Sequence, residues 1–342
     1  MKKEKPLIIS DPFPRTMELI FTKSQIKYLN TKFKLINAPN KNKSNFYDNY
    51  LPQAKYIIGQ PDLPTEIINK QKKLKAIFNV ESNFMDNMDY DYCFKNNIHV
   101  LATSPVFAQP VAEMALGLTL SIARSIHIAH YDFKKGKEKY GGEISKNNFL
   151  LKNKKFGLIG FGDLAKSLVP LLQSFSNNIM AYDPWVPDLE MNKVNVKPVS
   201  MKKVLSSSDI IYVLATITSS NEGMINKKIF KNIRDNTTFV LMSRAAIINF
   251  KDFYTFLKNR KVFAAIDVFP TEPFPKNDKF RKLKNVIFSP HRAGALDTAF
   301  KEMGNIVLSD LKLIDKGLPP RLCKKALKET VSNIRSKPVN IN

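Results

Sequence analysis

Hydrophobic residues in the first hundred positions fall in short runs separated by polar segments. Four of these runs are typical of buried strands: Pro6–Ser10, Lys55–Gly59, Leu74–Val80 and Ile98–Ala102. The polar segments between them, such as Leu63–Lys72, have helical spacing. Strands that alternate with helices form parallel sheets with helices on both faces. The pattern therefore predicts an α/β domain in this part of the chain.

The pattern changes after residue 108, where apolar residues predict one long helix from Gln109 to about Ala129. Pro110 lies near its start, where a missing N–H group costs little. The polar, glycine-bearing segment Lys134–Lys155 is then expected to be a surface connection.

A second alternating series begins at Phe156, and a further helix is expected over Asp297–Lys316. Six strands are expected in this series, in the segments FGLIG, IMAYD, DIIYVLA, TFVLMS, VFAAIDV and NVIFSP. Six strands in this order are typical of a complete doubly wound nucleotide-binding domain. We therefore predict an α/β fold of two doubly wound, Rossmann-like domains with parallel sheets.

Composition agrees with a globular protein of two domains, with 342 residues, 44% hydrophobic and 25% charged. The most apolar stretch, Pro105–Arg124, is interrupted by Gln109 and Glu113, so we expect no membrane span. The apolar run in MKKEKPLIIS is too short for a secretory signal, and a cytoplasmic location is expected. Cys93 and Cys323 lie far apart and predict neither a disulfide framework nor a metal site.

The net charge of +24 has two interpretations. A basic protein can bind nucleic acid or an anionic surface, or lysine can be enriched throughout a chain by biased base composition. The lysines are spread from end to end, without a basic arm or an aromatic RNA-binding motif. We therefore expect no nucleic-acid partner, although a cationic surface would speed the capture of an anionic substrate.

A cofactor fingerprint, G-x-G-x-x-A, lies at residues 160–165 between a predicted strand and a predicted helix. Gly160 permits the tight turn, and Gly162 lets the backbone approach a pyrophosphate. The helix that follows begins near Asp163 and Leu164 and presents its N–H groups to phosphate. The pattern alone is weak, since glycine turns between strands and helices are common.

The context of the fingerprint strengthens this prediction. Asp183 lies 23 residues after Gly160, at the end of the next strand, where an acid accepts hydrogen bonds from the adenosine ribose. A carboxylate there also repels a 2′-phosphate, so the sequence favours NAD over NADP. The alternative is an ordinary turn and a surface aspartate. Pro170 lies inside the expected helix and should kink or shorten it.

Reduction of a 2-keto acid needs a cation to hold the carboxylate, a proton donor, and a group that keeps the donor charged. Arg can grip a carboxylate with two hydrogen bonds, and a neighbouring Glu stabilises a protonated His. Candidates for all three occur in order in LMSRAAIIN at 241–249, AAIDVFPTEP at 264–273 and SPHRAGA at 289–295.

These segments resemble those of the D-isomer-specific 2-hydroxyacid dehydrogenase family. The resemblance implies that Arg244 binds the substrate carboxylate, that His291 is the acid/base and that Glu272 is its partner. It also implies an NAD-binding domain at 105–294, a substrate-binding domain at 1–104 with 295–342, and an active site in the cleft between them. Thr216 and Ser243 are implied near the cofactor, and Asp267 near the nicotinamide carboxamide; no metal is expected.

The loop over residues 81–86 departs from the family, in which this loop is rich in glycine and presents backbone N–H groups to the substrate. Ser82, Asn83 and Phe84 are the implied substrate-binding residues here. The absence of glycine predicts a reshaped pocket, while the alternative is that Phe84 packs beneath the loop. A second departure is Ala245, where the family often has glycine.

The resemblance predicts an NAD-dependent enzyme that interconverts a small D-2-hydroxy acid and its 2-keto acid. Glyoxylate, hydroxypyruvate and phosphohydroxypyruvate all remain open as substrates. An alternative is a non-catalytic, NAD-sensing regulator, because the family includes the C-terminal-binding-protein corepressors. A homodimer is expected through the long helix and residues 131–150. His127 and His130 lack a third metal ligand, and His99 is expected to be packed.

Overall fold

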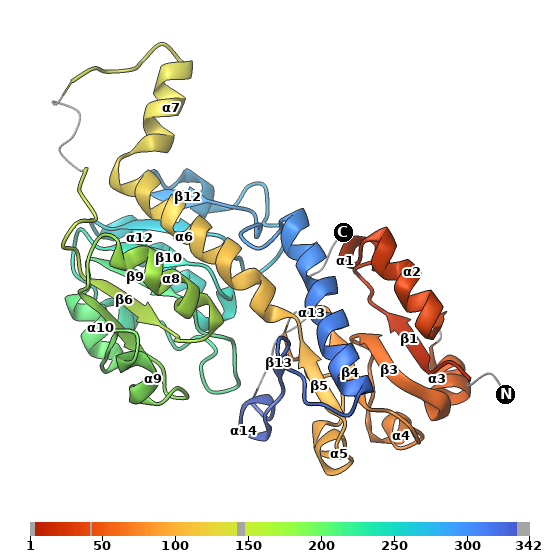
Figure 1. The fold of residues 1–342 in the computed structure, drawn as a ribbon. Helices are drawn as coiled ribbons and strands as arrows, with labels where there is room; N and C mark the ends of the chain where they lie inside the picture. The colour runs from red at the N-terminus through yellow and green to blue at the C-terminus, as the bar shows by residue number, and fades with distance from the viewer. Residues whose placement is uncertain (1–3, 42, 82, 142–147, 334–342) are drawn as a thin grey trace. The chain divides into compact units, whose positions relative to one another are not determined.

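The computed structural model describes residues 4–41, 43–81, 83–141 and 148–333. The chain divides into two compact units, Met1–Val106 with Leu296–Asn342, and Phe107–Ala295. These bounds lie within two residues of those expected from the sequence. The predicted fold class is confirmed, since each unit holds a mostly parallel sheet flanked by helices (Figure 1). The cleft between the units stays a prediction.

The first unit contains a six-stranded sheet in the order β13-β5-β4-β3-β1-β2. Its strands are β1 (Leu7–Asp11), β2 (Lys34–Asn37), β3 (Ala54–Gly59), β4 (Ala76–Asn79), β5 (His99–Ala102) and β13 (Lys324–Lys325). All neighbours pair in parallel except β13, which is antiparallel to β5. The four predicted strands are present. The two outer strands, β2 and β13, were not predicted because they are exposed or half-exposed and lack a run of buried apolar residues.

The helices of the first unit are α1 (Met17–Ile20), α2 (Lys23–Lys32), α3 (Ser44–Tyr50), α4 (Thr65–Ile68), α5 (Tyr90–Lys95), α13 (Asp297–Asp315) and α14 (Lys328–Val331). A capping box between Thr22 and Gln25 starts α2. Helix α13 packs on α1, and a Cβ added at Gly304 would lie 2.6 Å from the Ile20 carbonyl oxygen. Glycine is therefore needed for this close approach. The helix expected over Leu63–Lys72 is only the single turn of α4.

The second unit contains a seven-stranded, fully parallel sheet in the order β12-β11-β10-β9-β6-β7-β8. Its strands are β6 (Phe156–Ile159), β7 (Ile179–Tyr182), β8 (Lys197–Pro198), β9 (Ile210–Val213), β10 (Thr238–Leu241), β11 (Phe263–Ile266) and β12 (Val286–Phe288). The six predicted strands are all present, with β8 added at the edge. The chain order reverses between β6 and β9, and open α/β sheets bind ligands at the carboxyl ends of strands at such a point.

The helices of the second unit include a correction to the predicted long helix. They are α6 (Ala108–Ala123), α7 (Ile126–Lys134), α8 (Asp163–Gln173), α9 (Asp188–Asn192), α10 (Met201–Ser207), α11 (Lys227–Phe230) and α12 (Phe250–Asn259). One continuous helix over 109–129 is wrong, because Ser125 has a left-handed φ of 52° between α6 and α7. The Ser125 hydroxyl donates to Asn148 Oδ1 at 2.7 Å. Helix α7 stands away from the sheet of its unit (Figure 1).

Short 3-10 turns complete the described structure: η1 (Leu51–Gln53), η2 (Ser104–Phe107), η4 (Ala245–Ile247) and η5 (Lys279–Lys282). Helix α8 passes Pro170 and ends at Gln173, so the proline does not end the helix. His99 is half-buried, and burial lowers its pKa.

The segment Ser104–Ala123 is long and apolar enough to cross a membrane, judged by length and composition, with a mean hydropathy of 1.4. In the structure α6 packs along α8 and against β10 and β11. Core helices of globular domains can have the same length and apolar composition. Length and composition alone are therefore weak evidence for a membrane span.

Candidate active site

The glycine loop joins β6 to α8 at the point where the strand order reverses. Gly160 has a φ of +97°, and a Cβ there would lie 2.4 Å from the backbone nitrogen of Ala215. Only glycine fits this position. A Cβ at Gly162 would meet no described atom within 4 Å, so space is open beside the first turn of α8. The N–H groups of that turn, which begins at Asp163, suit a phosphate.

Asp183 follows β7 and contacts the glycine loop directly. Its Oδ2 accepts a hydrogen bond from the Phe161 N–H at 2.7 Å. Its Oδ1 accepts from the N–H groups of Trp185 at 2.8 Å and Val186 at 3.3 Å. The structure thus joins the two parts of the sequence fingerprint through a hydrogen bond. Contact of this carboxylate with a ribose stays a prediction.

Two further predicted cofactor residues lie after neighbouring strands of the sheet. Thr216 follows β9 and is exposed, and its carbonyl oxygen accepts from Asn221 Nδ2 at 2.8 Å. Ser243 follows β10 and is buried, and its hydroxyl has no hydrogen-bond partner within the described part of the chain. A buried hydroxyl without a partner is unfavourable, so Ser243 is suited to a polar group of a bound molecule.

Arg244 lies next to Ser243 and is half-buried. One guanidinium nitrogen donates to the Ser243 carbonyl oxygen at 2.8 Å. Ala245 is buried and begins η4, so this turn accepts a side chain where the family often has glycine. The positive charge of Arg244 is close enough to help lower the pKa of Glu272.

His291 and Glu272 form a hydrogen-bonded pair in the second unit. His291 Nδ1 lies 2.6 Å from Glu272 Oε2, and Glu272 Oε1 accepts from the Phe269 N–H at 3.0 Å. Burial acts to raise the pKa of Glu272, but the hydrogen bonds from His291 and Phe269 outweigh it, and the net shift is downward. Glu272 is therefore an anion at neutral pH, so Nδ1 carries a hydrogen. The other ring nitrogen, Nε2, is left for proton transfer.

Asp267 holds the loop that carries His291. Its backbone carbonyl accepts from the His291 N–H at 2.7 Å. Its carboxylate accepts from the Ser289 hydroxyl and from the N–H groups of Arg292 at 3.1 Å and Ala293 at 3.2 Å. Burial nevertheless raises the pKa of Asp267. These bonds fix His291 at a left-handed φ of 49°, a strained conformation that surrounding contacts must maintain. Contact of Asp267 with nicotinamide stays a prediction.

The predicted substrate loop lies in the first unit, where Asn79 and Tyr90 hold it. Asn79 Oδ1 accepts from the Glu81 N–H at 2.9 Å, and Asn79 Nδ2 donates to the Asn83 carbonyl at 2.7 Å. The Tyr90 hydroxyl donates to the Met85 carbonyl at 2.7 Å. Side-chain hydrogen bonds thus shape a loop that has no glycine. Ser82 lies outside the described residues.

Phe84 belongs to the core of the first unit. It is 5% exposed and packs edge-on against Tyr90, with ring centroids 6.4 Å apart. The interpretation in which Phe84 packs beneath the loop is therefore confirmed for its side chain. Substrate contact through the backbone of Asn83 and Phe84 stays a prediction.

Arg15 was not predicted as part of this region. Its guanidinium lies 3.1 Å from Glu81 Oε2 and 5.0 Å from the centroid of the Phe300 ring. The feature of the sequence that could have indicated this ion pair is Glu81, an acidic residue that follows the buried strand β4. The pairing itself joins residues far apart in sequence, so spacing could not reveal it.

Comparison with known proteins identifies the family. Residues 116–293 match the model of the D-isomer specific 2-hydroxyacid dehydrogenase, NAD binding domain. The chain belongs to this D-2-hydroxyacid dehydrogenase family.

Several relatives resemble this chain over both of its units. A crystal structure of a phosphoglycerate oxidoreductase from Rhizobium etli is 41% identical, with a TM-score of 0.85, and the match covers 95% of this chain and 100% of that one. The D-3-phosphoglycerate dehydrogenase of Archaeoglobus fulgidus is 30% identical over 79% of this chain and 50% of its own length. The hydroxypyruvate reductase of Thermotoga maritima is 32% identical, and the match covers 70% of this chain and 77% of that protein. This chain spans about half the length of the two D-3-phosphoglycerate dehydrogenases it matches.

NAD is the cofactor of this D-2-hydroxyacid dehydrogenase domain, and the residues present fit it. The open space beside Gly162 and the first turn of α8 suit the pyrophosphate. The buried Ser243 hydroxyl is suited to another polar group of the cofactor. Within the described ranges no group of three His, Cys, Asp or Glu side chains could hold a metal.

Proposed function

We propose that this protein is an NAD-dependent dehydrogenase that interconverts a small D-2-hydroxy acid and its 2-keto acid. The observation that carries the proposal is the 2.6 Å contact between His291 Nδ1 and Glu272 Oε2. This pair lies in the same domain as the glycine loop and Arg244. The residues that we propose as proton donor, anionic partner and carboxylate-binding cation therefore belong to one unit.

Each residue has a distinct part in the proposed mechanism. Arg244 binds and orients the substrate carboxylate through two charge-assisted hydrogen bonds. His291 Nε2 donates a proton to the carbonyl oxygen during reduction and removes it during oxidation. Glu272 stabilises the imidazolium that donates this proton. Bound NAD(H) supplies or accepts the hydride.

The substrate is proposed to be glyoxylate, hydroxypyruvate or phosphohydroxypyruvate, as the names of the relatives suggest. A panel of these acids, assayed by NADH oxidation and repeated with NADPH, tests the proposal. We expect turnover of at least one acid, a preference for NADH because of Asp183, and a higher KM and lower kcat in Arg244→Ala. Tight NADH binding without turnover of any 2-keto acid would instead favour an NAD-sensing regulator.

We also propose a homodimer that forms through α7. This helix has no buried residue, and four large apolar side chains are exposed on it: Ile126, Ile128, Tyr131 and Phe133. Exposed apolar surface of this kind marks interaction sites. Residues 142–147 of the predicted contact segment lie outside the described residues.

The free cysteines Cys93 and Cys323 support the proposed cytoplasmic location.

A further inference from the structure

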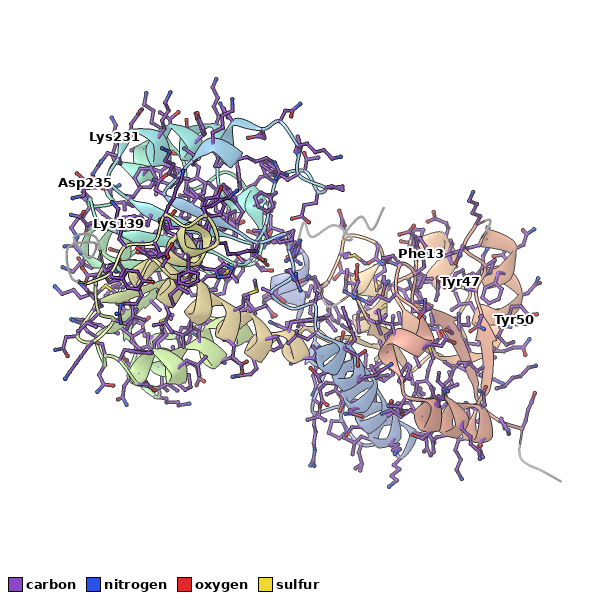
Figure 2. All side chains as sticks on the ribbon, turned by 90° about the horizontal axis from the view of Figure 1, so that it is seen from above. Phe13, Tyr47, Tyr50, Lys139, Lys231 and Asp235 are labelled. Atoms are coloured by element: carbon purple, nitrogen blue, oxygen red, sulfur yellow. The ribbon has the colours of Figure 1, made fainter. Side chains whose placement is uncertain are left out.

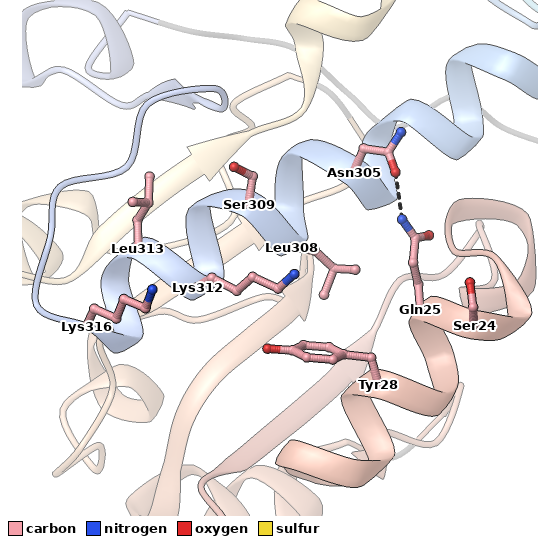
Figure 3. Close-up of a pocket in the computed structure, with 9 residues that line it drawn as sticks. All are labelled: Ser24, Gln25, Tyr28, Asn305, Leu308, Ser309, Lys312, Leu313 and Lys316. Atoms are coloured by element: carbon pink, nitrogen blue, oxygen red, sulfur yellow. Dashed lines mark hydrogen bonds between the residues drawn. The ribbon is translucent and has the colours of Figure 1, made fainter.

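A hollow of about 520 Å³ lies between α2 and α13 in the first unit (Figure 3). Sites for small ligands have volumes of roughly 300–1,000 Å³, so this one is large enough for a metabolite. Both helices belong to one unit, and the glycine loop and His291 belong to the other. The residues that line the hollow are therefore not those of the glycine loop or of the proposed proton donor.

The hollow is lined by positive and neutral side chains. Lys312 lies in the last turn of α13, and Lys316 is the residue that follows the helix. Among the nine described residues that line the hollow none is Asp or Glu. An anion bound beside these two ammonium groups would make charge-assisted hydrogen bonds with them.

One wall of the hollow is aromatic and apolar. Lys312 Nζ lies 4.6 Å from the centroid of the Tyr28 ring, and Leu308 also lines the space. Near its other end, Gln25 Nε2 donates to Asn305 Oδ1 at 2.6 Å (Figure 3). A ring face beside two cations suits a ligand with one anionic end and one flat, apolar part.

We propose that this hollow binds a small organic phosphate. Its phosphate group contacts Lys312 and Lys316, and its apolar part packs on Tyr28. A cationic ligand has no carboxylate to bind among the lining residues. The apolar wall adds affinity that inorganic phosphate cannot obtain.

Phenyl phosphate and inorganic phosphate are suitable probes for the intact, NADH-saturated protein. Binding is measured by ligand-observed NMR at constant ionic strength. For Lys312→Gln/Lys316→Gln we expect the Kd of phenyl phosphate to rise by roughly tenfold or more, because two charge-assisted contacts are lost. For Tyr28→Leu we expect weaker binding of phenyl phosphate but an unchanged Kd for inorganic phosphate.

The control is the double variant Lys279→Gln/Lys282→Gln on η5 of the other unit. It removes the same charge, and Lys279 Nζ also lies over a tyrosine ring, 4.2 Å from the centroid of Tyr254. We expect this variant to bind phenyl phosphate like the wild type. Phenyl phosphate that binds at the proposed dehydrogenase site should bind there equally in both double variants. Such binding therefore does not affect the difference in Kd between them.

Three results would overturn the proposal. The first is an equal loss of phenyl phosphate binding in the two double variants. The second is no saturable binding of phenyl phosphate to the wild type. The third is binding of a poly-glutamate peptide, instead of phenyl phosphate, to the hollow. Failure of the proposed dehydrogenase activity leaves the proposal intact, because the readout is binding and not turnover.

Discussion

At the scale of single residues, the His291–Glu272 pair is proposed to control the charge that proton transfer needs. Hydrogen bonds hold the pKa of Glu272 below its ordinary value although burial opposes this. The contribution of the ionised carboxylate to stability is therefore complete above the ordinary glutamate pKa. It is lost only as the pH falls through the lowered pKa of the folded protein.

Glu272→Gln keeps the shape of the side chain but removes its charge. Without the anion, the proton donor of the proposed mechanism loses the charge that stabilises its protonated form. Reduction of the keto acid should therefore fail earlier as the pH rises, with the alkaline limit of kcat/KM moved to lower pH. A pH–rate profile of wild type and variant checks this. An unmoved alkaline limit would remove Glu272 from the mechanism.

The sequence indicated some candidate site residues and could not indicate others, for a physical reason. Arg244, Glu272 and His291 lie in short motifs at or after predicted strands, so pattern and resemblance were enough to nominate them. Asn79 and Arg15 act through contacts that depend on the folded chain. The side chain of Phe84 turns into the core, and the alternation of apolar residues did not decide between core and pocket.

At the scale of elements, the glycine loop provides a matched pair of substitutions. Gly160→Ala places a Cβ 2.4 Å from the Ala215 backbone nitrogen at a φ of +97°. We expect it to destabilise the protein by more than about 1 kcal/mol. Gly162→Ala enters open space, so its stability should match the wild type, while its Kd for NADH should rise by roughly tenfold because the backbone can no longer approach the pyrophosphate.

Thermal unfolding and calorimetric titration with NADH measure the two effects separately. Equal melting temperatures for Gly160→Ala and wild type would contradict the packing described for this turn. An unchanged Kd for NADH in Gly162→Ala would contradict binding of the pyrophosphate beside Gly162.

Elements were predictable where burial was complete. Five of the six predicted strands of the second unit are buried along most or all of their length, and their apolar runs were visible in the sequence. The exception is β12, in which one residue of three is buried. The edge strands β2, β8 and β13 are exposed or partly exposed and left little such signal. The break between α6 and α7 depends on the backbone of Ser125, and a single serine in an apolar segment does not indicate it.

At the scale of the whole molecule, the charge of +24 is distributed and not gathered in one arm. Figure 2 shows long side chains with terminal nitrogens pointing outward on both units, among them the exposed Lys139 and Lys231. Such a surface attracts anionic substrates and raises their rate of capture, an effect that salt screens.

Assembly is tested at the same scale with two variants of equal exposure. Phe133 on α7 and Leu189 on α9 are both 63% exposed. Light scattering at micromolar concentration should give the mass of a dimer for wild type and for Leu189→Ser. Phe133→Ser should shift the equilibrium toward the monomer because apolar surface is lost from the proposed interface. A monomeric wild type would exclude the proposed dimer.

The most direct test of the central claim measures turnover and cofactor binding in the same His291→Ala preparation. With the best 2-keto acid of the panel, kcat should fall by about 10²–10⁴-fold, because the proton donor is gone. The Kd for NADH should stay within about twofold of the wild type, because the glycine loop and Asp183 are unchanged. A near wild-type kcat, or a loss of activity explained by lost NADH binding, would contradict the account.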